Sequence, residues 1–239
     1  MIYSIVSEKG GVGKTSVCEA ISDGLQLRGQ RVLVLDADPQ TCITAAMSAD
    51  RTKPTLYDFL KDAADAIQTT RRGDLIAGDR RLARITKIDP AALRDALQPL
   101  RGRYDTIVID CPPAHGPLSS MAIVAADELI IPVTADAYSL QAIGNIRTTI
   151  QEAEREGRTV KIAGLLITRY IGRTVVNKEL SRMIEDAAAE LNTRAFDTKI
   201  RECTAIRTAQ AMRQGIFEFA PRSNAAKDYA AFIDELTGK

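Results

Sequence analysis

The stretch that decides the fold is Lys9-Gly10-Gly11-Val12-Gly13-Lys14-Thr15. It follows a short, mostly apolar run, residues 2–6, and opens a helical pattern over residues 14–28. Glycines between a strand and a helix let backbone N–H groups wrap phosphate oxygens at the helix N-terminus. This stretch therefore predicts a nucleotide site.

The residue types in this loop suit a phosphate chain and a divalent cation. Lys14 is expected to contact the β and γ phosphates, and the Thr15 hydroxyl is expected to ligate Mg²⁺. The glycines tolerate the close approach and the positive φ that such a loop needs. The predicted nucleotide-binding residues of the loop are Gly10, Gly11, Val12, Gly13, Lys14, Thr15 and Ser16.

Apolar runs and helical patterns alternate along the rest of the chain. The further runs are 31–35, 105–109, 129–133 and 162–167, and the further helical patterns are 90–100, 140–155, 175–191, 205–214 and 224–236. Continuous apolar strands between helices are typical of a mainly parallel sheet with helices on both faces. We therefore predict an α/β fold in a single domain over residues 1–239. Residues 50–84 contain no motif that we can place, and they are a candidate peripheral insertion.

Two carboxylate motifs follow predicted strands. About 15 helical residues after the loop lead roughly 22 Å away, and six strand residues return about 20 Å, which brings Asp36 back beside the phosphates. Asp38 follows two residues later, and a cap on a helix beginning near Thr41 is its alternative role. Asp110 ends the apolar run 107–109, where a bound metal would give its buried carboxylate a partner.

The loop with Lys9 resembles the deviant Walker A motif of the ParA/MinD family of P-loop ATPases. Glu8 stands where a strict Walker A motif has glycine, and Lys9 matches the extra lysine of that family. Residues 33–40 are similar to the family's second motif, and residues 107–113 to its Walker B motif. The resemblance implies a P-loop NTPase fold, ATP and Mg²⁺ as cofactors, and slow ATP hydrolysis.

The resemblance also implies roles for single residues. Lys9, Lys14 and Asp38 would be catalytic: Lys9 would reach the partner's phosphates in an ATP-closed homodimer, and Asp38 would orient the attacking water. The implied metal site is formed by Thr15, Asp36 and Asp110. Thr168 and Arg169, which end a later strand of the family, would lie near the adenine.

Charge is unevenly distributed along the chain. The net charge is +1, from 32 Lys+Arg against 31 Asp+Glu, but residues 158–222 hold 12 basic and 7 acidic residues. Clustered Lys and Arg bind DNA phosphates without sequence preference, so we predict non-specific DNA binding, with solvated helix faces as the alternative. Similarity to ParA sequences suggests Arg173 as a DNA contact and, less directly, Arg201 and Arg207.

Composition argues against several other sites and locations. The four cysteines are far apart and form no C-x-x-C pair, so zinc and iron–sulfur sites lack their usual ligand spacing. No apolar run approaches the roughly 20 residues of a membrane-spanning helix, and the acidic end 228–239 disfavours an anionic membrane as partner. Residues 1–6 lack signal-peptide features, so we expect a cytoplasmic, nucleoid-associated protein.

The leading functional prediction is a ParA-type partition ATPase. Its ATP-bound homodimer would bind DNA non-specifically, and a centromere-binding, ParB-like adaptor would stimulate hydrolysis to segregate plasmid or chromosomal DNA. The N-terminal helix-turn-helix domain of longer plasmid ParA proteins is not expected here. One alternative is an orphan relative that positions a protein complex. Another is a P-loop ligase related to dethiobiotin synthetase, against which Lys9 argues.

Overall fold

The computed structural model describes residues 1–62, 65–113, 116–155, 160–172 and 175–238. Within these ranges the centre of the molecule is a seven-stranded sheet in the order β3-β4-β2-β5-β1-β6-β7. Its strands are β1 Ile2–Ile5, β2 Val32–Asp36, β3 Ile67–Thr70, β4 Gly73–Ile76, β5 Thr106–Asp110, β6 Glu128–Thr134 and β7 Lys161–Thr168. Every neighbouring pair is parallel except β3 with β4, which is antiparallel.

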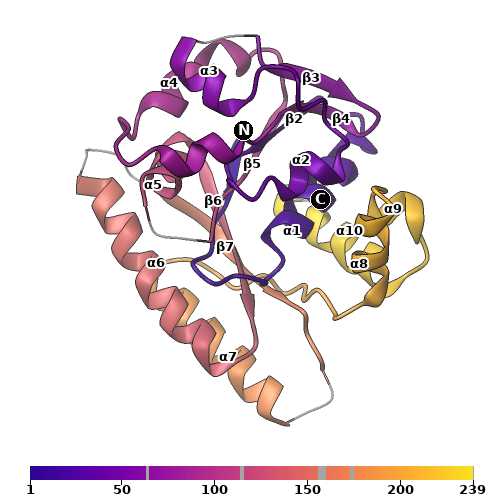
Figure 1. Cartoon of the computed structure of the whole chain (residues 1–239). Coiled ribbons are helices and arrows are strands. Elements are labelled where there is room, and N and C mark those ends of the chain that lie inside the picture. The colour runs from indigo at the N-terminus through magenta and orange to yellow at the C-terminus, as the bar shows by residue number, and fades with distance from the viewer. Residues whose placement is uncertain (63–64, 114–115, 156–159, 173–174, 239) are drawn as a thin grey trace.

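Helices cover both faces of this sheet (Figure 1). One face packs against α3 Leu56–Asp62, α4 Ala92–Leu97, α5 Pro117–Ala125, α6 Ala137–Arg155 and α7 Val175–Glu190. The other packs against α1 Lys14–Gln26, α2 Cys42–Ala46, α8 Thr204–Ala211, α9 Ile216–Phe219 and α10 Asn224–Thr237. Short 3₁₀ turns, η1 Arg80–Arg84 and η2 Gln98–Leu100, complete the described elements.

Each face of the sheet has its own hydrophobic core, and the side chains of successive strand residues point alternately into one core and the other. In β5, Ile107 and Ile109 pack on the α5 side while Val108 packs on the α1 side, and all three are almost completely buried. In the sequence, a strand that is buried on both faces is a continuous apolar run, because the side chains on each face pack against apolar neighbours. The predicted α/β fold with a mainly parallel sheet is therefore confirmed.

The interpretation of residues 50–84 as a peripheral insertion was wrong. β4 pairs with β2 inside the sheet, with Leu33 opposite Asp74 and Leu35 opposite Ile76, and β3 forms the edge beyond it. Only four residues long, β4 has too few apolar positions to show a strand period in the sequence. Pairing with β2 is a long-range contact that the local pattern does not encode.

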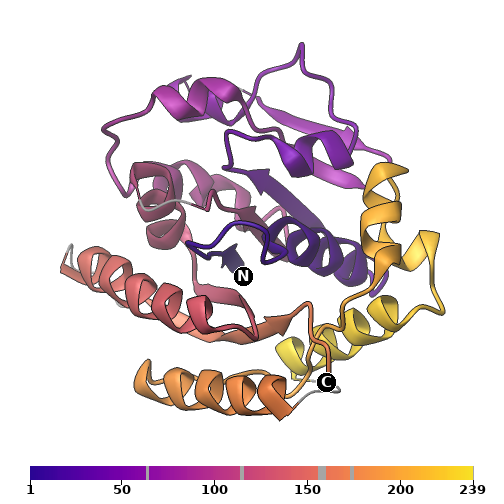
Figure 2. The ribbon, with the colours of Figure 1, turned by 60° about the horizontal axis from the view of Figure 1, so that its bottom comes forward.

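Parallel strands bring several functional candidates to one edge of the sheet. Asp36 at the end of β2 lies opposite Asp110 at the end of β5, and Asp110 also lies opposite Ile5 of β1. The glycine loop leaves β1 at this same edge and continues into α1. Figure 2 shows α6 beside α7 on one side of the molecule and α9 and α10 next to α1 on the other. In the described ranges, no helix combines the length and apolar character needed to cross a bilayer.

Candidate functional site

The glycine loop adopts the conformation that its sequence predicts. Gly11 and Gly13 have φ of 75° and 93°, in the left-handed region, and Gly13 directly precedes the first residue of α1. A side chain at either position would be strained by this backbone even though no atom lies within 4 Å of the missing Cβ. The loop thus leaves free space above the N-terminus of α1, where the helix dipole favours an anion.

Lys14 provides a buried cation at the base of the loop. It is 8% exposed, and its ammonium donates a hydrogen bond of 3.3 Å to the carbonyl oxygen of Lys9. Burial lowers the pKa of Lys14, and the charge of Asp110 partly offsets that effect. An ammonium with so little solvent is stabilised by a phosphate more than an exposed lysine would be, because less water competes for its charge.

Asp110 and Thr15 form the most informative pair in the site. The Thr15 hydroxyl donates to Asp110 Oδ2 at 2.8 Å, while Oδ1 of this 1% exposed residue has no hydrogen-bond partner in the described structure. Burial, followed by the charge of Asp36, raises the pKa of Asp110 well above its ordinary value. An orphaned buried carboxylate oxygen next to a hydroxyl fits Mg²⁺ or a water bound to it, since Mg²⁺ takes oxygen ligands and keeps several waters.

Asp36 has a different environment from the one expected of an open metal ligand. Its Oδ2 accepts from the backbone N–H of Thr44 at 3.0 Å and from the Thr44 hydroxyl at 2.5 Å, and its Oδ1 accepts from the N–H of Asp38 at 3.1 Å. Burial raises its pKa to about 6 despite these three bonds. Because both oxygens are engaged within the chain, Asp36 acts as a brace for the segment that carries Asp38.

Asp38 lies at the edge of the cavity, 8% exposed, and its Oδ1 accepts from the N–H of Gln40 at 2.8 Å. It does not cap α2: Thr41 occupies the capping position, and no side-chain hydrogen bond caps that helix. The alternative role of Asp38 as a helix cap is therefore not what the structure contains. Its carboxylate borders the same space as the phosphate loop.

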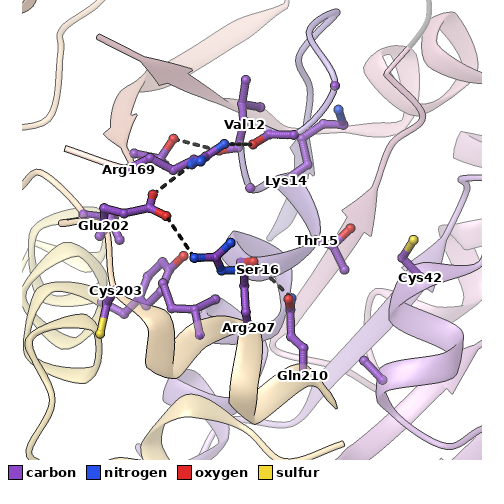
Figure 3. A pocket seen from close by; sticks show the side chains of 18 of the residues that line it. Val12, Lys14, Thr15, Ser16, Cys42, Arg169, Glu202, Cys203, Arg207 and Gln210 are labelled. Atoms are coloured by element: carbon purple, nitrogen blue, oxygen red, sulfur yellow. Dashed lines mark hydrogen bonds and ion pairs between the residues drawn. The ribbon is translucent and has the colours of Figure 1, made fainter. Parts of the chain in front are cut away.

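A cavity of about 670 Å³ runs from the phosphate loop to the segment 200–213 (Figure 3). Thr168 supports the loop from below, because its hydroxyl donates to the carbonyl oxygen of Val12 at 2.7 Å and is itself buried. Arg169 lies across the loop, donating to the carbonyl oxygen of Gly11 at 3.3 Å and to Glu202 at 2.8 Å. Both residues expected near the adenine thus border the cavity and also fix the loop.

The three arginines predicted to contact DNA differ in position and in their contacts. Arg201 forms a bidentate ion pair with Asp228, with contacts of 2.6 and 2.9 Å, and Arg207 lies 3.9 Å from Glu202. Arg201 and Arg207 line the cavity beside the loop. Arg173 lies outside the described residues.

Lys9 points back into its own chain. Its ammonium donates to the Thr134 hydroxyl at 3.0 Å and pairs with the carboxylate of Asp136. These bonds hold the lysine at the loop's outer side, in a second hollow that Lys9 shares with Asp136 and Ile171.

Sequence reasoning missed several residues of the site. Gln210 of α8 donates to the Ser16 hydroxyl at 3.1 Å (Figure 3) and to Glu19 at 2.7 Å. These two hydrogen bonds connect α8, which lines the cavity, to α1. Thr44 and Glu202 were not predicted either. Gln210 is 194 residues from Ser16, so no local pattern could have indicated the contact.

Known protein families match the chain from end to end. The family described as an AAA domain matches residues 1–162, and the family of 4Fe-4S iron sulfur cluster binding proteins, NifH/frxC, matches residues 116–239. The described part of this chain contains no group of three or more His, Cys, Asp or Glu residues that could hold a metal by themselves.

Two relatives carry informative names. The chain is 30% identical over 215 residues to the chromosome partitioning protein ParA of Caulobacter vibrioides, covering 83% of this chain and 79% of that protein. It is 28% identical over 249 residues to the chromosome-partitioning ATPase Soj of Thermus thermophilus, covering 99% and 95% of the two chains.

Solved structures extend the likeness to three dimensions. The fold superimposes on an aspartate-to-alanine variant of Cyanothece McdA in complex with ATP, with a TM-score of 0.87, 25% identity and coverage of 99% and 96%. It also superimposes on the septum site-determining protein MinD of Pyrococcus horikoshii complexed with Mg-ADP, with a TM-score of 0.80, 27% identity and coverage of 98% and 95%.

Proposed function

Because the chain belongs to the ParA/MinD family of P-loop ATPases, we propose that it binds Mg²⁺ with ATP in the loop at residues 9–16 and hydrolyses ATP slowly as the timing step of a DNA-partition cycle. One observation carries the assignment of the site. Asp110 has a buried carboxylate oxygen without a partner, next to the Thr15 hydroxyl and at the foot of a loop whose glycines leave room for phosphates.

The proposed chemistry depends on positioning and charge neutralisation. Lys14 and the N-terminal N–H groups of α1 hold the β and γ phosphates, and Thr15 and Asp110 hold the metal side of the site. Mg²⁺, when bound with ATP, neutralises charge that builds up on the phosphates. Asp38 orients the attacking water, and Asp36 acts through Asp38 by holding its backbone N–H.

The proposed cycle requires a second copy of the chain. Lys9 exchanges its contacts with Thr134 and Asp136 for the phosphates bound by the partner subunit, so that ATP closes a homodimer. This dimer binds DNA non-specifically in the nucleoid, and a centromere-binding, ParB-like adaptor stimulates hydrolysis. The cargo is plasmid or chromosomal DNA, and residues 1–239 act as a single domain.

ATP turnover tests this proposal. The protein is assayed first alone, then with duplex DNA, and then with DNA and the candidate adaptor. We expect slow basal turnover that rises with DNA and adaptor, and Lys14→Ala should abolish ATP uptake in calorimetry, whereas Lys161→Ala, at the opposite end of the sheet, should not. Turnover that requires a small carboxylate substrate would instead support a ligase.

A further inference from the structure

The segments on either side of α3 and η1 are strongly basic. Residues 51–61 and 77–87 together contain seven basic and two acidic residues. The basic residues that are exposed and form no ion pair in the described structure are Lys61, whose ammonium lies 4.4 Å from the centre of the Tyr57 ring, and Arg51, Lys53, Arg80, Arg84 and Lys87. The last five have no such ring contact among the described residues. We call these five residues the α3 patch.

The two segments lie side by side although about 25 residues separate them in sequence. The N–H of Leu56 donates to the carbonyl oxygen of Ala77 at 2.8 Å, and the Thr55 hydroxyl donates to Asp79 at 3.1 Å. Lys53 is two residues before Thr55, and Arg80 directly follows Asp79, so both cations are within a few residues of this contact. The two segments therefore lie side by side, and Lys53 of one is near Arg80 of the other.

Both acidic residues of these segments are already neutralised. Arg81 pairs with Asp58 at 2.7 Å and with Asp79 at 2.6 Å, and its hydrogen bonds lower the pKa of Asp58. One guanidinium thus occupies both carboxylates. Outside the two segments, the charge of Asp50 interacts with Lys53, but no carboxylate forms an ion pair with any of the five residues of the α3 patch in the described structure.

The basic region at residues 158–222 differs in this respect. There Arg169 pairs with Glu202, Lys199 with Glu185 and Arg201 with Asp228, and Arg207 also lies beside Glu202. A carboxylate beside a cation repels an approaching phosphate and reduces the attraction of that cation. In the same region Lys161, Lys178, Arg213 and Arg222 form no ion pair in the described structure. Net charge counted along the sequence does not reveal this pairing.

The α3 patch is also connected to the hydrolysis site. Gly78, two residues before Arg80, donates its N–H to the Thr44 hydroxyl at 2.7 Å, and that hydroxyl donates in turn to Asp36. Asp36 holds the N–H of Asp38, the residue proposed to orient the water. A ligand on the patch therefore contacts a segment that is three hydrogen bonds away from Asp38.

We propose that the α3 patch binds the phosphate backbone of duplex DNA without sequence preference. This inference rests on the proposed DNA-binding function and specifies its surface, which is separate from the arginines at the nucleotide cavity. Five phosphate contacts would release counterions, so the logarithm of affinity should fall with the logarithm of salt concentration with a slope contribution of about −4.5. Figure 1 places α3 and α7 at opposite ends of the molecule, so the two basic regions can be tested separately.

The test compares two full-length variants with the same number of charges removed. The patch variant carries Arg51→Gln, Lys53→Gln, Arg80→Gln, Arg84→Gln and Lys87→Gln, and the control carries Lys161→Gln, Lys178→Gln, Arg182→Gln, Arg194→Gln and Arg222→Gln. Fluorescence anisotropy measures binding to a labelled random-sequence duplex, with ATP and Mg²⁺, from low to high salt. Near-UV circular dichroism verifies that both variants are folded.

We expect the patch variant to lose at least tenfold in affinity at low salt and most of the salt slope, while the control retains both to within about threefold. If the wild type binds DNA and the patch variant binds equally well, the patch proposal is overturned while the DNA-binding function stands. If the control alone loses binding, the surface at residues 158–222 is the DNA site. If the wild type itself does not bind DNA at low salt, the proposed function fails together with the inference.

Discussion

At the scale of single residues, the site combines two buried carboxylates that do different work. Asp110 has an oxygen left open beside Thr15, whereas both oxygens of Asp36 are bonded to Thr44 and Asp38. The two lie opposite each other on neighbouring strands. We propose that Asp110 faces the metal, whereas Asp36 braces the segment that carries Asp38.

Asp38→Ala is expected to separate binding from chemistry. Removing the carboxylate leaves the phosphate loop intact, so ATP binding and dimerisation should persist, but the water loses its positioning group and the turnover number should fall about 100-fold or more. Single-turnover ATP hydrolysis and calorimetry measure the two effects. A variant that hydrolyses ATP at the wild-type rate would exclude a water-positioning role for Asp38.

Thr44 should matter through its contacts with Asp36 and Gly78. Thr44→Val removes the hydroxyl that bridges Asp36 and Gly78, so we expect a lower turnover number with a nearly unchanged KM, while Thr44→Ser, which keeps the hydroxyl, should restore most of the turnover. Steady-state kinetics of both variants provide the comparison. Equal losses in both would show that the hydroxyl alone does not explain the role of Thr44, because Thr44→Ser keeps the hydroxyl and removes only the methyl group.

From the raised pKa of Asp110 we predict how the stability of the protein depends on pH. Its pKa is raised on folding, so the native state binds more protons than the unfolded state, and the free energy of unfolding of the nucleotide-free protein should fall as pH rises from about 4 through the raised pKa. Asp110→Asn should reduce this slope, leaving the part that comes from the raised pKa of Asp36, and should be more stable than the wild type at pH 7.

Asp105 is a control of opposite sign for that experiment. Hydrogen bonds from Arg31 lower its pKa to about 2, so its contribution to stability is present above about pH 4 and is lost as pH falls toward 2. Urea denaturation of Asp110→Asn and Asp105→Asn across pH measures both slopes. An Asp110→Asn protein less stable than the wild type at pH 7 would contradict the assignment of an uncompensated buried charge.

At the scale of elements, β4 is what ties the segment 67–84 to the nucleotide site. After β4 leaves the sheet beside β2, Gly78 passes so close to Asp36 that an added Cβ would lie 2.7 Å from the carboxyl carbon. The backbone at Gly78 is therefore part of the wall around Asp36. Packing, and not backbone conformation, requires glycine there, because the φ of Gly78 is not in the left-handed region.

Gly78→Ala should consequently destabilise the protein by about 1–3 kcal/mol, the usual cost of overpacking a buried site. Gly144→Ala is the matched control, since Gly144 lies in α6 with no atom within 4 Å of its missing Cβ, and alanine there should stabilise the helix by up to about 1 kcal/mol. Urea denaturation gives both values. A neutral Gly78→Ala would mean that β4 shifts away from Asp36 at little cost.

At the scale of the whole molecule, Lys9 links the chain's own conformation to assembly. In the single chain it is held by Thr134 and Asp136, at the end of β6, and the proposed dimer requires it to leave them. Lys9→Ala should therefore keep ATP binding but lose ATP-dependent dimerisation, measured by light scattering with Mg²⁺ and ATP. Lys161→Ala should dimerise like the wild type, and a Lys9→Ala protein that also dimerises normally would remove this lysine from the interface.

The sequence alone was sufficient where the physics is local. Consecutive residues form the glycine loop, and the lengths of one helix and one strand return Asp36 to it, so the P-loop fold and the neighbourhood of Lys14, Thr15, Asp36 and Asp110 could be predicted. Continuous apolar runs indicated a sheet buried on both faces, because such strands need apolar partners on each side.

Only the tertiary structure decided the rest, because those features depend on contacts between distant segments. The pairing of β4 with β2, the bond from Gln210 to Ser16 and the bond from Gly78 to Thr44 join residues whose partners no local pattern names. The same holds for charge: a sequence counts cations, whereas folding determines which of them, such as Arg201, receive a carboxylate and which, such as Arg80 and Arg84, do not.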